Sequence, residues 1–376
     1  MRGTRVMRRA LLLGLLLVAA TSGTSTRAAV SPPSPGGFAD GAFCTYGKGY
    51  FSNSAEAAQR IQGGLPFSIG ASPNTYTWSD VAALQQAVGT GGRPGAFSTS
   101  ATNPTDMGTG GDLAAQTLTE NLNLNFSERV VTPTGLHPLS LVDMDGVKLD
   151  GVRLTSAQAS ALNGQAAVQV LLAANVALGG GALPYSLSFT QLTDLIRLLN
   201  GSFSEPYRDA NGVGQPCGNP SKFAQAHMYQ PYVTSNAFAG KRPASISTFA
   251  PKPQYNTFSG EVVHVGRGCP PGSPAPVPAG GDPYLANPAG KIALIERGAC
   301  RFDFKIGRAT LAGATGVIVY NNAAGGEALV VMGGSNPVPL PDGTVVSITI
   351  PAAFVQRSTG LLLRDGTPPV TAFVQQ

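Results

Sequence analysis

Three histidines are the first residues to test for catalysis or metal binding: His137, His227 and His264. They lie far apart in the chain and no H-E-x-x-H motif joins any two of them, although zinc hydrolases place such ligands one helical turn apart. The G-x-S-x-G elbow of serine hydrolases is also missing, since the nearest segment, residues 333–337, reads GGSNP. These residues therefore predict neither a metal site nor an activated nucleophile.

The acidic residues form no recognisable catalytic or calcium-binding pattern. Aspartic proteases need the order D-T-G, whereas Asp342 and Asp365 each begin the order D-G-T, which is typical of a turn. Asp143 and Asp209 begin stretches that resemble calcium loops, but neither loop has a glutamate at its twelfth position. The sequence favours a protein with no catalytic residues, no metal and no cofactor. An unrecognised catalytic site is the alternative.

The chain has four cysteines, and no two of them form a C-x-x-C pair, so a structural zinc site is not expected. In an exported protein an even number of cysteines indicates disulfides, and four cysteines allow three pairings. We expect Cys269–Cys300, because this bond would pin the proline-rich loop 270–290 to the sheet. Cys44–Cys217 then follows by elimination.

Residues 1–29 are predicted to be a cleaved signal peptide, with an uncleaved signal anchor as the alternative. A basic start precedes the apolar run Ala10–Ala20, which is too short to span a bilayer. Residues 30–37, VSPPSPGG, are expected to be a linker. Arginines before residue 30 account for the whole net charge of +5, so no basic surface for nucleic acid is implied. We expect a secreted protein, extracellular or at the cell surface, with no stable membrane span after cleavage.

Residues 38–203 are predicted to form an α-rich domain of unknown function. Apolar residues recur there at helical spacing, and glycine or asparagine follows several of the runs. The predicted helices lie within residues 79–89, 111–126, 164–181 and 188–203.

Residues 204–244 show no clear hydrophobic period and are expected to be a connector. After them the hydrophobic pattern changes from helical spacing to short apolar runs. Short apolar runs bounded by Gly, Pro or Asn are typical of strands, and they lie at residues 260–266, 291–296, 317–322, 328–332 and 346–355. Between the second and third runs, apolar or small residues at helical spacing from Phe302 to Gly313 predict a helix. This part is therefore expected to contain a β–α–β unit.

Residues 245–376 resemble the protease-associated (PA) domain. The positions that carry the resemblance are Gly290-Lys291 before IALIERG, then Cys300, Phe302, Lys305, Ala309, Ala312-Gly313-Ala314, GVIVYNN, Met332-Gly333-Gly334 and Ile350-Pro351. The resemblance implies an open, barrel-like sheet with flanking helices. The expected fold class is α+β with two domains, an α-rich N-terminal domain and a PA-like α/β domain.

The N-terminal half carries a weaker resemblance. CTYGKGYFSN (44–53) and the later LAAQTLTENLNLN (113–125) are similar to a Cys-Thr…Gly-Tyr-Trp-Lys-Asn segment and a helix found in some bacterial secreted and surface proteins. Phe51 stands where that segment usually has Trp, and Ser52 where it usually has Lys. This resemblance implies no activity.

The PA resemblance implies a role in binding. Such domains occur beside proteases, aminopeptidases, receptors and ubiquitin ligases, where they bind proteins or peptides or shape access to a neighbouring catalytic site. We therefore predict a secreted, non-catalytic protein whose PA-like domain binds a protein or peptide. The alternative is an accessory component of an extracellular protease or hydrolase, or a hydrolase with an unrecognised site in 38–203.

Binding is expected in loops of the PA-like domain, since rigid strands position such loops for recognition. The candidate side chains are Asn321 and Asn322, whose amides would meet a peptide backbone, and Ser335. The loops concerned are residues 268–290, 321–328 and 333–343.

Overall fold

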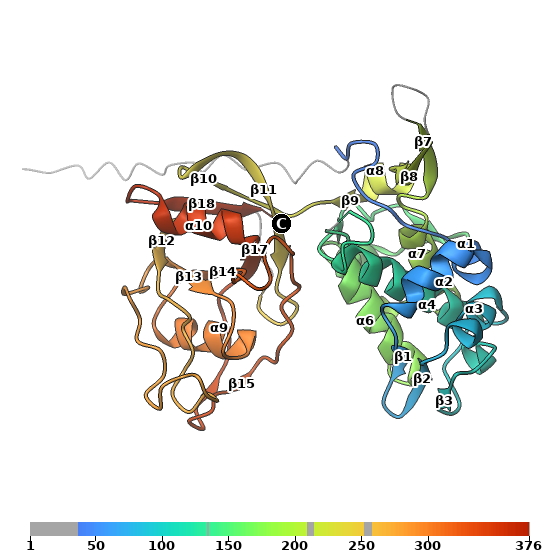
Figure 1. The fold of residues 1–376 in the computed structure, drawn as a ribbon, viewed down its shortest axis with the longest axis horizontal. Coiled ribbons are helices and arrows are strands. Elements are labelled where there is room, and N and C mark those ends of the chain that lie inside the picture. Colours follow the sequence, from blue (N-terminus) through green and yellow to red (C-terminus); the bar gives the residue numbers. More distant parts are fainter. Residues whose placement is uncertain (1–36, 134, 209–213, 252–257, 376) are drawn as a thin grey trace, which may run out of the picture. The chain divides into compact units, whose positions relative to one another are not determined.

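The computed structural model describes the chain over residues 37–133, 135–208, 214–251 and 258–375 (Figure 1). The predicted signal peptide (1–29) and all but the last residue of the expected linker (30–37) lie outside these residues, as does Asp209. The described residues form an α-rich part and a β-barrel with helices, which confirms the α+β fold class.

The α-rich part is built mainly from helices. They are α1 (Lys48–Asn53), α2 (Ala55–Gln62), α3 (Val81–Gly89), α4 (Gly111–Glu128), α5 (Ser156–Leu162), α6 (Ala167–Leu178), α7 (Phe189–Asn200) and α8 (Lys222–His227). Its short strands are β1 (Phe67–Ala71), β2 (Asn74–Trp78), β3 (Ala101–Thr102), β4 (Ser140–Leu141), β5 (Lys148–Leu149), β6 (Val152–Arg153), β7 (Glu205–Arg208), β8 (Gly214–Asn219) and β9 (Met228–Tyr229).

The helices predicted from periodicity are all found, as α3, α4, α6 and α7. α7 shows why: the Ser188 hydroxyl accepts a hydrogen bond from Gln191 N (3.1 Å), and the Gln191 side chain accepts one from Ser188 N (3.0 Å). This reciprocal capping satisfies amide groups that the first turn of a helix leaves free. Helices that were not predicted from the sequence, such as α1 and α8, are too short to show a clear hydrophobic period.

α4 has both an apolar and a polar buried side. Leu118, Leu122 and Phe126, which recur at helical spacing, are fully buried in the main core of the α-rich part. On its polar side, Glu120 and Asn123 are also almost completely buried. A helix buried all round lies inside its domain, and α4 contacts α3, α6 and α7.

A buried hydrogen-bond network joins α4 to α7 and to the segment before α1. The Asn123 amide donates to Asn200 Oδ1 and to Tyr46 O, both at 3.0 Å, and accepts from Tyr46 N at 2.8 Å. The Asn200 amide donates in turn to Gln116 Oε1 at 3.0 Å. The CTYGKGYFSN motif (44–53) is thus held on α4 by backbone contacts, which is a structural role.

The segment 204–244, expected to be a connector, contributes to both parts of the protein. β9 pairs with β4, and Met228 lies in the core of the α-rich part. Cys44 is bonded to Cys217, one of the two expected pairs. The residues from Tyr232 to Ile246 form two barrel strands, so the barrel includes residues before 245.

The barrel part contains these elements: β10 (Tyr232–Ser235), β11 (Phe238–Ile246), β12 (Ser259–His264), β13 (Ile292–Glu296), α9 (Phe302–Leu311), β14 (Gly316–Tyr320), β15 (Val338–Pro339), β16 (Val345–Val346), β17 (Ala352–Val355), α10 (Arg357–Asp365) and β18 (Thr371–Gln375).

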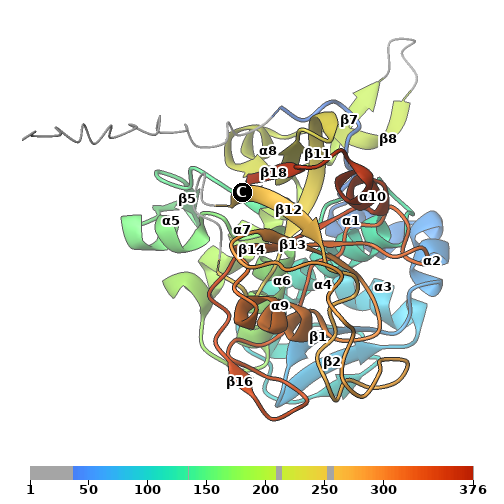
Figure 2. The ribbon, with the colours of Figure 1, turned by 90° about the vertical axis from the view of Figure 1, so that its left-hand side faces the viewer.

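Seven of these strands close into a barrel in the order β10-β11-β17-β14-β13-β12-β18. Within it β12, β13, β14 and β17 are parallel neighbours, and α9 connects β13 to β14 as the predicted β–α–β unit. Figures 1 and 2 both show α9 and α10 on opposite sides of β13 and β14. Successive side chains of a strand point to opposite faces. Accordingly Val317 and Val319 share a core with Ile306 of α9, while Ile318 and Tyr320 share one with Leu363 of α10.

The strand predicted at 328–332 is wrong, because these residues form no strand. Met332 is fully buried and Leu329 packs against the core near α9, so the apolar run is explained by burial alone. Strand β14, which precedes this run, is already paired with β13 on one side and β17 on the other. The predicted run 346–355 is strand only in part, since it holds the end of β16 and all of β17.

Candidate functional site

The carboxyl ends of the parallel strands lie together at one edge of the barrel. β12 ends at His264, β13 at Glu296, β14 at Tyr320 and β17 at Val355. The register places Glu296 beside Tyr320 and Tyr320 beside Val355. We call this edge, with the segments that follow these four strands, the rim. Segments that are far apart in sequence meet there because parallel strands end on the same side.

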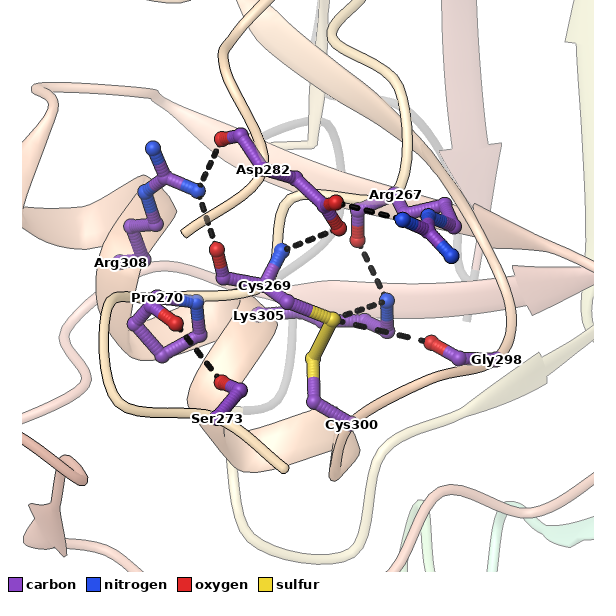
Figure 3. Close-up of polar contacts among 9 residues, drawn as sticks. All are labelled: Arg267, Cys269, Pro270, Ser273, Asp282, Gly298, Cys300, Lys305 and Arg308. Atoms are coloured by element: carbon purple, nitrogen blue, oxygen red, sulfur yellow. Dashed lines mark hydrogen bonds and ion pairs between the residues drawn. A yellow bond between two sulfur atoms is a disulfide. The ribbon is translucent and has the colours of Figure 1, made fainter. Parts of the chain in front are cut away.

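The loop 268–290 is anchored to α9 by charged side chains (Figure 3). Arg308 Nη1 donates to the carbonyls of Cys269 (2.5 Å) and Asp282 (2.6 Å). The Asp282 carboxylate, almost fully buried, pairs with Arg267 at 2.7 Å. A disulfide joins Cys269 to Cys300, the second expected pair. The long loop is therefore held at its start and at Asp282.

Lys305 of α9 is fully buried beneath the same loop. Its ammonium donates to the carbonyl of Arg267 and lies 3.5 Å from Cys269 Sγ (Figure 3). Burial in the protein lowers the pKa of Lys305 to about 8, although the nearby Asp282 carboxylate opposes the shift. Lys305 is thus a buried residue of α9 that contacts both the loop 268–290 and the disulfide Cys269–Cys300.

The turn 297–300 after β13 contacts both the loop 268–290, through the disulfide Cys269–Cys300, and the loop 321–328. Gly298 (φ +117°) and Ala299 (φ +66°) both have positive φ, and the first of these suits glycine, which has no Cβ to clash. Arg297 Nη1 donates to Asn321 Oδ1 at 3.1 Å. Asn322 Nδ2 lies so close to Gly298 that a Cβ there would be 3.3 Å away. The turn 297–300 is therefore packed against the start of the loop that follows β14.

Asn321 supports the loop 321–328 from inside. Its side chain is fully buried, accepts from Arg297 and from Asn322 N (3.0 Å), and donates to Ala328 O (2.9 Å). The Asn321 amide thus already has partners within the protein, and its expected contact with a peptide backbone stays a prediction. Asn322, half-buried, remains a candidate; its Oδ1 accepts from Gly325 N at 2.9 Å.

The loop 333–343 is held by a buried acid. The carboxylate of Asp303 in α9 accepts from Ser335 N (3.0 Å) and Ser335 Oγ (3.2 Å). It also accepts from Phe304 N and pairs with Arg301 at 2.5 Å. A Cβ on Gly272 would lie 3.2 Å from Pro341, so this loop also touches the loop 268–290. No hydrogen bond among the described residues joins Ser335 to Asn322, and the two expected contact residues belong to separate networks.

Sequence reasoning missed a polar cluster on the α10 side of the rim. Tyr320 Oη and His264 Nε2 are 3.2 Å apart. Burial, and after it Glu296, raises the pKa of Tyr320, while burial and then Arg364 lower the pKa of His264. Both side chains are therefore neutral near pH 7, and they can donate or accept hydrogen bonds without carrying charge. A signal was present in the sequence, since β12 ends in His264 and β14 ends in Tyr320, both of which are polar.

The remaining histidines are not brought to the rim. His137 is half-buried in the α-rich part, with its Nε2 3.9 Å from Glu128 Oε2, and desolvation lowers its pKa. His227 ends α8. In the described ranges no three His, Cys, Asp or Glu side chains are grouped as metal ligands would be. The part of the chain that is described also contains no helix long and apolar enough to cross a bilayer.

Comparison with known proteins assigns the barrel part to a family. Residues 258–363 match the family model of the PA domain. This part of the chain is a PA domain. It is similar to the C5a peptidase of Streptococcus pyogenes serotype M3, with 42% identity over 84 residues, which is 22% of this chain and 6% of that protein. The chain therefore spans only a small fraction of this relative.

Two solved structures are also similar over part of the chain. The zinc aminopeptidase BSAP from Bacillus subtilis has a TM-score of 0.27 and 23% identity, over 39% of this chain and 30% of that chain. The subtilisin-like protease Apa1 from Pseudoalteromonas sp. AS-11 has a TM-score of 0.27 and 22% identity, over 39% of this chain and 32% of that chain. Most of each of these proteins has no counterpart in the present chain.

Proposed function

We propose that this protein is secreted and non-catalytic, and that its PA domain binds a protein or peptide at the rim. The observation that supports this most is the anchoring of the rim loops by polar side chains: the half-buried Arg308 and the buried Asn321 and Asp303 each hold one loop. Loops that are ordered before binding lose little conformational entropy when a partner arrives. The predicted signal peptide places that partner outside the cell or at its surface.

A second candidate function is that of an accessory protein for an extracellular protease. The similarity of the PA domain to a segment of a C5a peptidase favours it. In that case the partner is a catalytic chain, and adding the purified protein to that chain changes the rate or the selectivity of cleavage. A partner without hydrolase activity supports the first proposal.

The test is capture of partners from the culture in which the protein is secreted, with the full mature chain as bait. Asn322→Ala at the rim is compared with Asn163→Ala in the α-rich part. The two are matched, because both side chains are half-buried and the Asn163 side chain accepts from Met144 N as the Asn322 side chain accepts from Gly325 N. We expect Asn322→Ala and Ser335→Ala to reduce recovery of the partner and Asn163→Ala to leave it unchanged.

Each of these substitutions removes only one or two hydrogen bonds, so each is expected to cost no more than about 1–2 kcal/mol of unfolding free energy. Thermal unfolding of all three variants checks this. Equal recovery by wild type and both rim variants would place the binding surface elsewhere and overturn the proposal.

A further inference from the structure

An open groove of about 620 Å³ runs along α10 in the PA domain, against the hairpin of β10 and β11. Its lining includes Leu361 and Leu362 of α10, and Leu362 is 37% exposed. Arg242 of β11 and Ser358 of α10 also line it, and so does Asp365 at the carboxyl end of α10. The groove therefore offers an apolar wall together with one positive and one negative side chain.

Two arginines have no acidic partner here: Arg242, which lines the groove, and Arg357, which begins α10 next to the lining residue Ser358. The Nε atoms of Arg242 and Arg357 are buried and make no hydrogen bond, and no ion pair joins either side chain to a described carboxylate. A buried donor without an acceptor costs free energy. An acid supplied by a ligand removes that cost, which distinguishes these two arginines from a solvated surface charge.

The strand register brings the two arginines to the same end of the β11–β17 pair. Ala244 of β11 pairs with Val355 of β17, and Arg242 and Arg357 each lie two residues beyond that pair. Side chains two residues apart in a strand point the same way. Ala244 packs in the core that contains Leu363 of α10, so Arg242 of β11 projects on the α10 side, and Arg357 begins α10 itself.

The acidic side chains near the groove already accept hydrogen bonds from other residues of this chain. Glu327 accepts from Ser358 N (3.0 Å) and Ser358 Oγ (2.6 Å), and so caps the first turn of α10. Asp365, at the other end of α10, accepts from Arg364 at 2.7 and 2.8 Å. A carboxylate for Arg242 and Arg357 must therefore come from another molecule.

We propose that this groove binds an extended acidic segment of a partner protein, with a carboxylate at Arg242 and Arg357 and an apolar side chain against Leu361 and Leu362. The proposal rests on the binding function proposed above and adds its chemistry. α10 has nine residues and is about 13 Å long, which matches about four residues of extended peptide.

The groove also gives the segment a direction. A Cβ on Gly366 would lie 2.9 Å from Ala237 Cβ, so the carboxyl end of α10 is next to the hairpin turn. Arg242 lies further along β11, away from that turn, and Arg357 begins α10. The acidic end of the peptide therefore lies at the first turn of α10, away from the carboxylate of Asp365.

The experiment measures binding of fluorescein-labelled acetyl-Asp-Glu-Leu-Leu-amide to the full mature chain by fluorescence anisotropy. The comparison peptide is acetyl-Asn-Gln-Leu-Leu-amide, which has the same shape without the charges. We expect the acidic peptide to bind at least about tenfold more tightly, since hydrogen bonds to charged groups contribute on this scale. Added salt should weaken the binding of the acidic peptide alone.

Arg242→Gln is compared with Lys241→Gln, which removes the same charge from the neighbouring position, where Lys241 lies over the ring of Tyr232. Arg242→Gln should lower the affinity about tenfold or more, and Lys241→Gln by less than about twofold. Arg357→Gln provides an independent second variant with the same expected loss. Equal affinity for the two peptides, or equal effects of Arg242→Gln and Lys241→Gln, overturns the proposal.

Failure of the groove proposal can be distinguished from failure of the proposed binding function of the rim. If the captured partner needs Asn322 but no acidic peptide binds, the rim function stands and the groove proposal fails. If the acidic peptide binds through Arg242 but no captured partner depends on the rim, the groove is supported and the rim assignment fails.

Discussion

Both parts of the protein bury carboxyl groups, but Glu120 and Asp303 are buried in opposite ways. Glu120 in the α-rich part has no hydrogen-bond partner for Oε2, and burial raises its pKa to about 8. Asp303 in the PA domain is fully buried but accepts from Arg301, Phe304 N and Ser335. The α-rich part joins its helices with neutral amides and keeps its acid protonated, whereas the PA domain uses charged groups to hold its loops.

The difference follows from what each part must position. The α-rich core lies between helices whose own backbone groups are satisfied, so a few Asn and Gln side chains complete the contacts. The PA domain must hold long loops that have little regular structure. Charge-assisted hydrogen bonds are stronger than neutral ones, and Arg308 and Asp303 use them to fix loop backbone at the rim.

The largest expected effect concerns the disulfides, one in each part. Cys44 and Cys217 are 173 residues apart and Cys269 and Cys300 are 31 apart. Because a longer closed loop removes more entropy from the unfolded chain, replacing the first pair by alanine should cost about 5 kcal/mol of unfolding free energy and replacing the second about 4 kcal/mol. Urea unfolding of the two double variants measures this, and the reverse order would contradict the chain-entropy explanation.

The next effect is the pH dependence that Glu120 gives the α-rich part. Its pKa is raised from 4.5 to about 8 in the folded protein, so the folded state retains a proton that the unfolded state loses. Stability is highest below pH 4.5 and falls as the pH rises toward 8, by an amount on the order of 4 kcal/mol. Glu120→Gln should abolish most of this fall.

Urea unfolding at pH 5 to 8 is the measurement, with Glu128→Gln as control, since Glu128 ends the same helix and is exposed. An identical pH profile for wild type and Glu120→Gln would show that Glu120 does not titrate as a buried acid.

Asp303→Ala tests the role of a buried, charged and fully hydrogen-bonded carboxylate in the PA domain. It removes a buried acceptor that holds Arg301, the start of α9 and the loop at Ser335. We expect a loss of about 3 kcal/mol, because several hydrogen bonds to one charged group are lost together. Ser335→Ala, which removes one of them, should cost about 1 kcal/mol. Comparable losses in the two variants, measured by thermal unfolding, would mean that Asp303 does not act as the shared anchor.

The smallest expected effect has the opposite pH direction to that of Glu120. Burial lowers the pKa of Lys305 from 10.5 to about 8, so above pH 8 the folded state has released a proton that the unfolded state keeps. Stability should therefore rise between pH 8 and 10, by about 2 kcal/mol. Lys305→Met should remove this rise, and Lys291→Met, at a half-exposed lysine paired with Glu261, should retain it. A rise that persists in Lys305→Met would exclude Lys305 as its source.

Much of the architecture could be predicted from local patterns. Apolar periodicity and caps located α3, α4, α6 and α7, and the alternation of strand and helix located β12, β13, α9 and β14. Patterns within about ten residues determine such elements, because helix and strand formation depend on near neighbours. The strand prediction for residues 328–332 was wrong because it also rested on a local pattern alone. That pattern favours a strand, but β14 has no free edge with which the run could pair.

The candidate site could be predicted only in outline. The loops were located because glycine and proline mark them, and the resemblance to the PA domain named their role. The sequence alone did not show that Asn321 faces inward, since only the contacts with Arg297 and Ala328 decide this.

The sequence by itself determined the α+β class, the PA domain and the turns that separate its strands, because these depend on residues close together along the chain. The tertiary structure decided which distant residues meet. His264 lies beside Tyr320, and Arg242 and Arg357 both lie two residues beyond the pair of Ala244 and Val355. Such pairs arise from strand order and register in a closed barrel, and no pattern within a single segment carries that information.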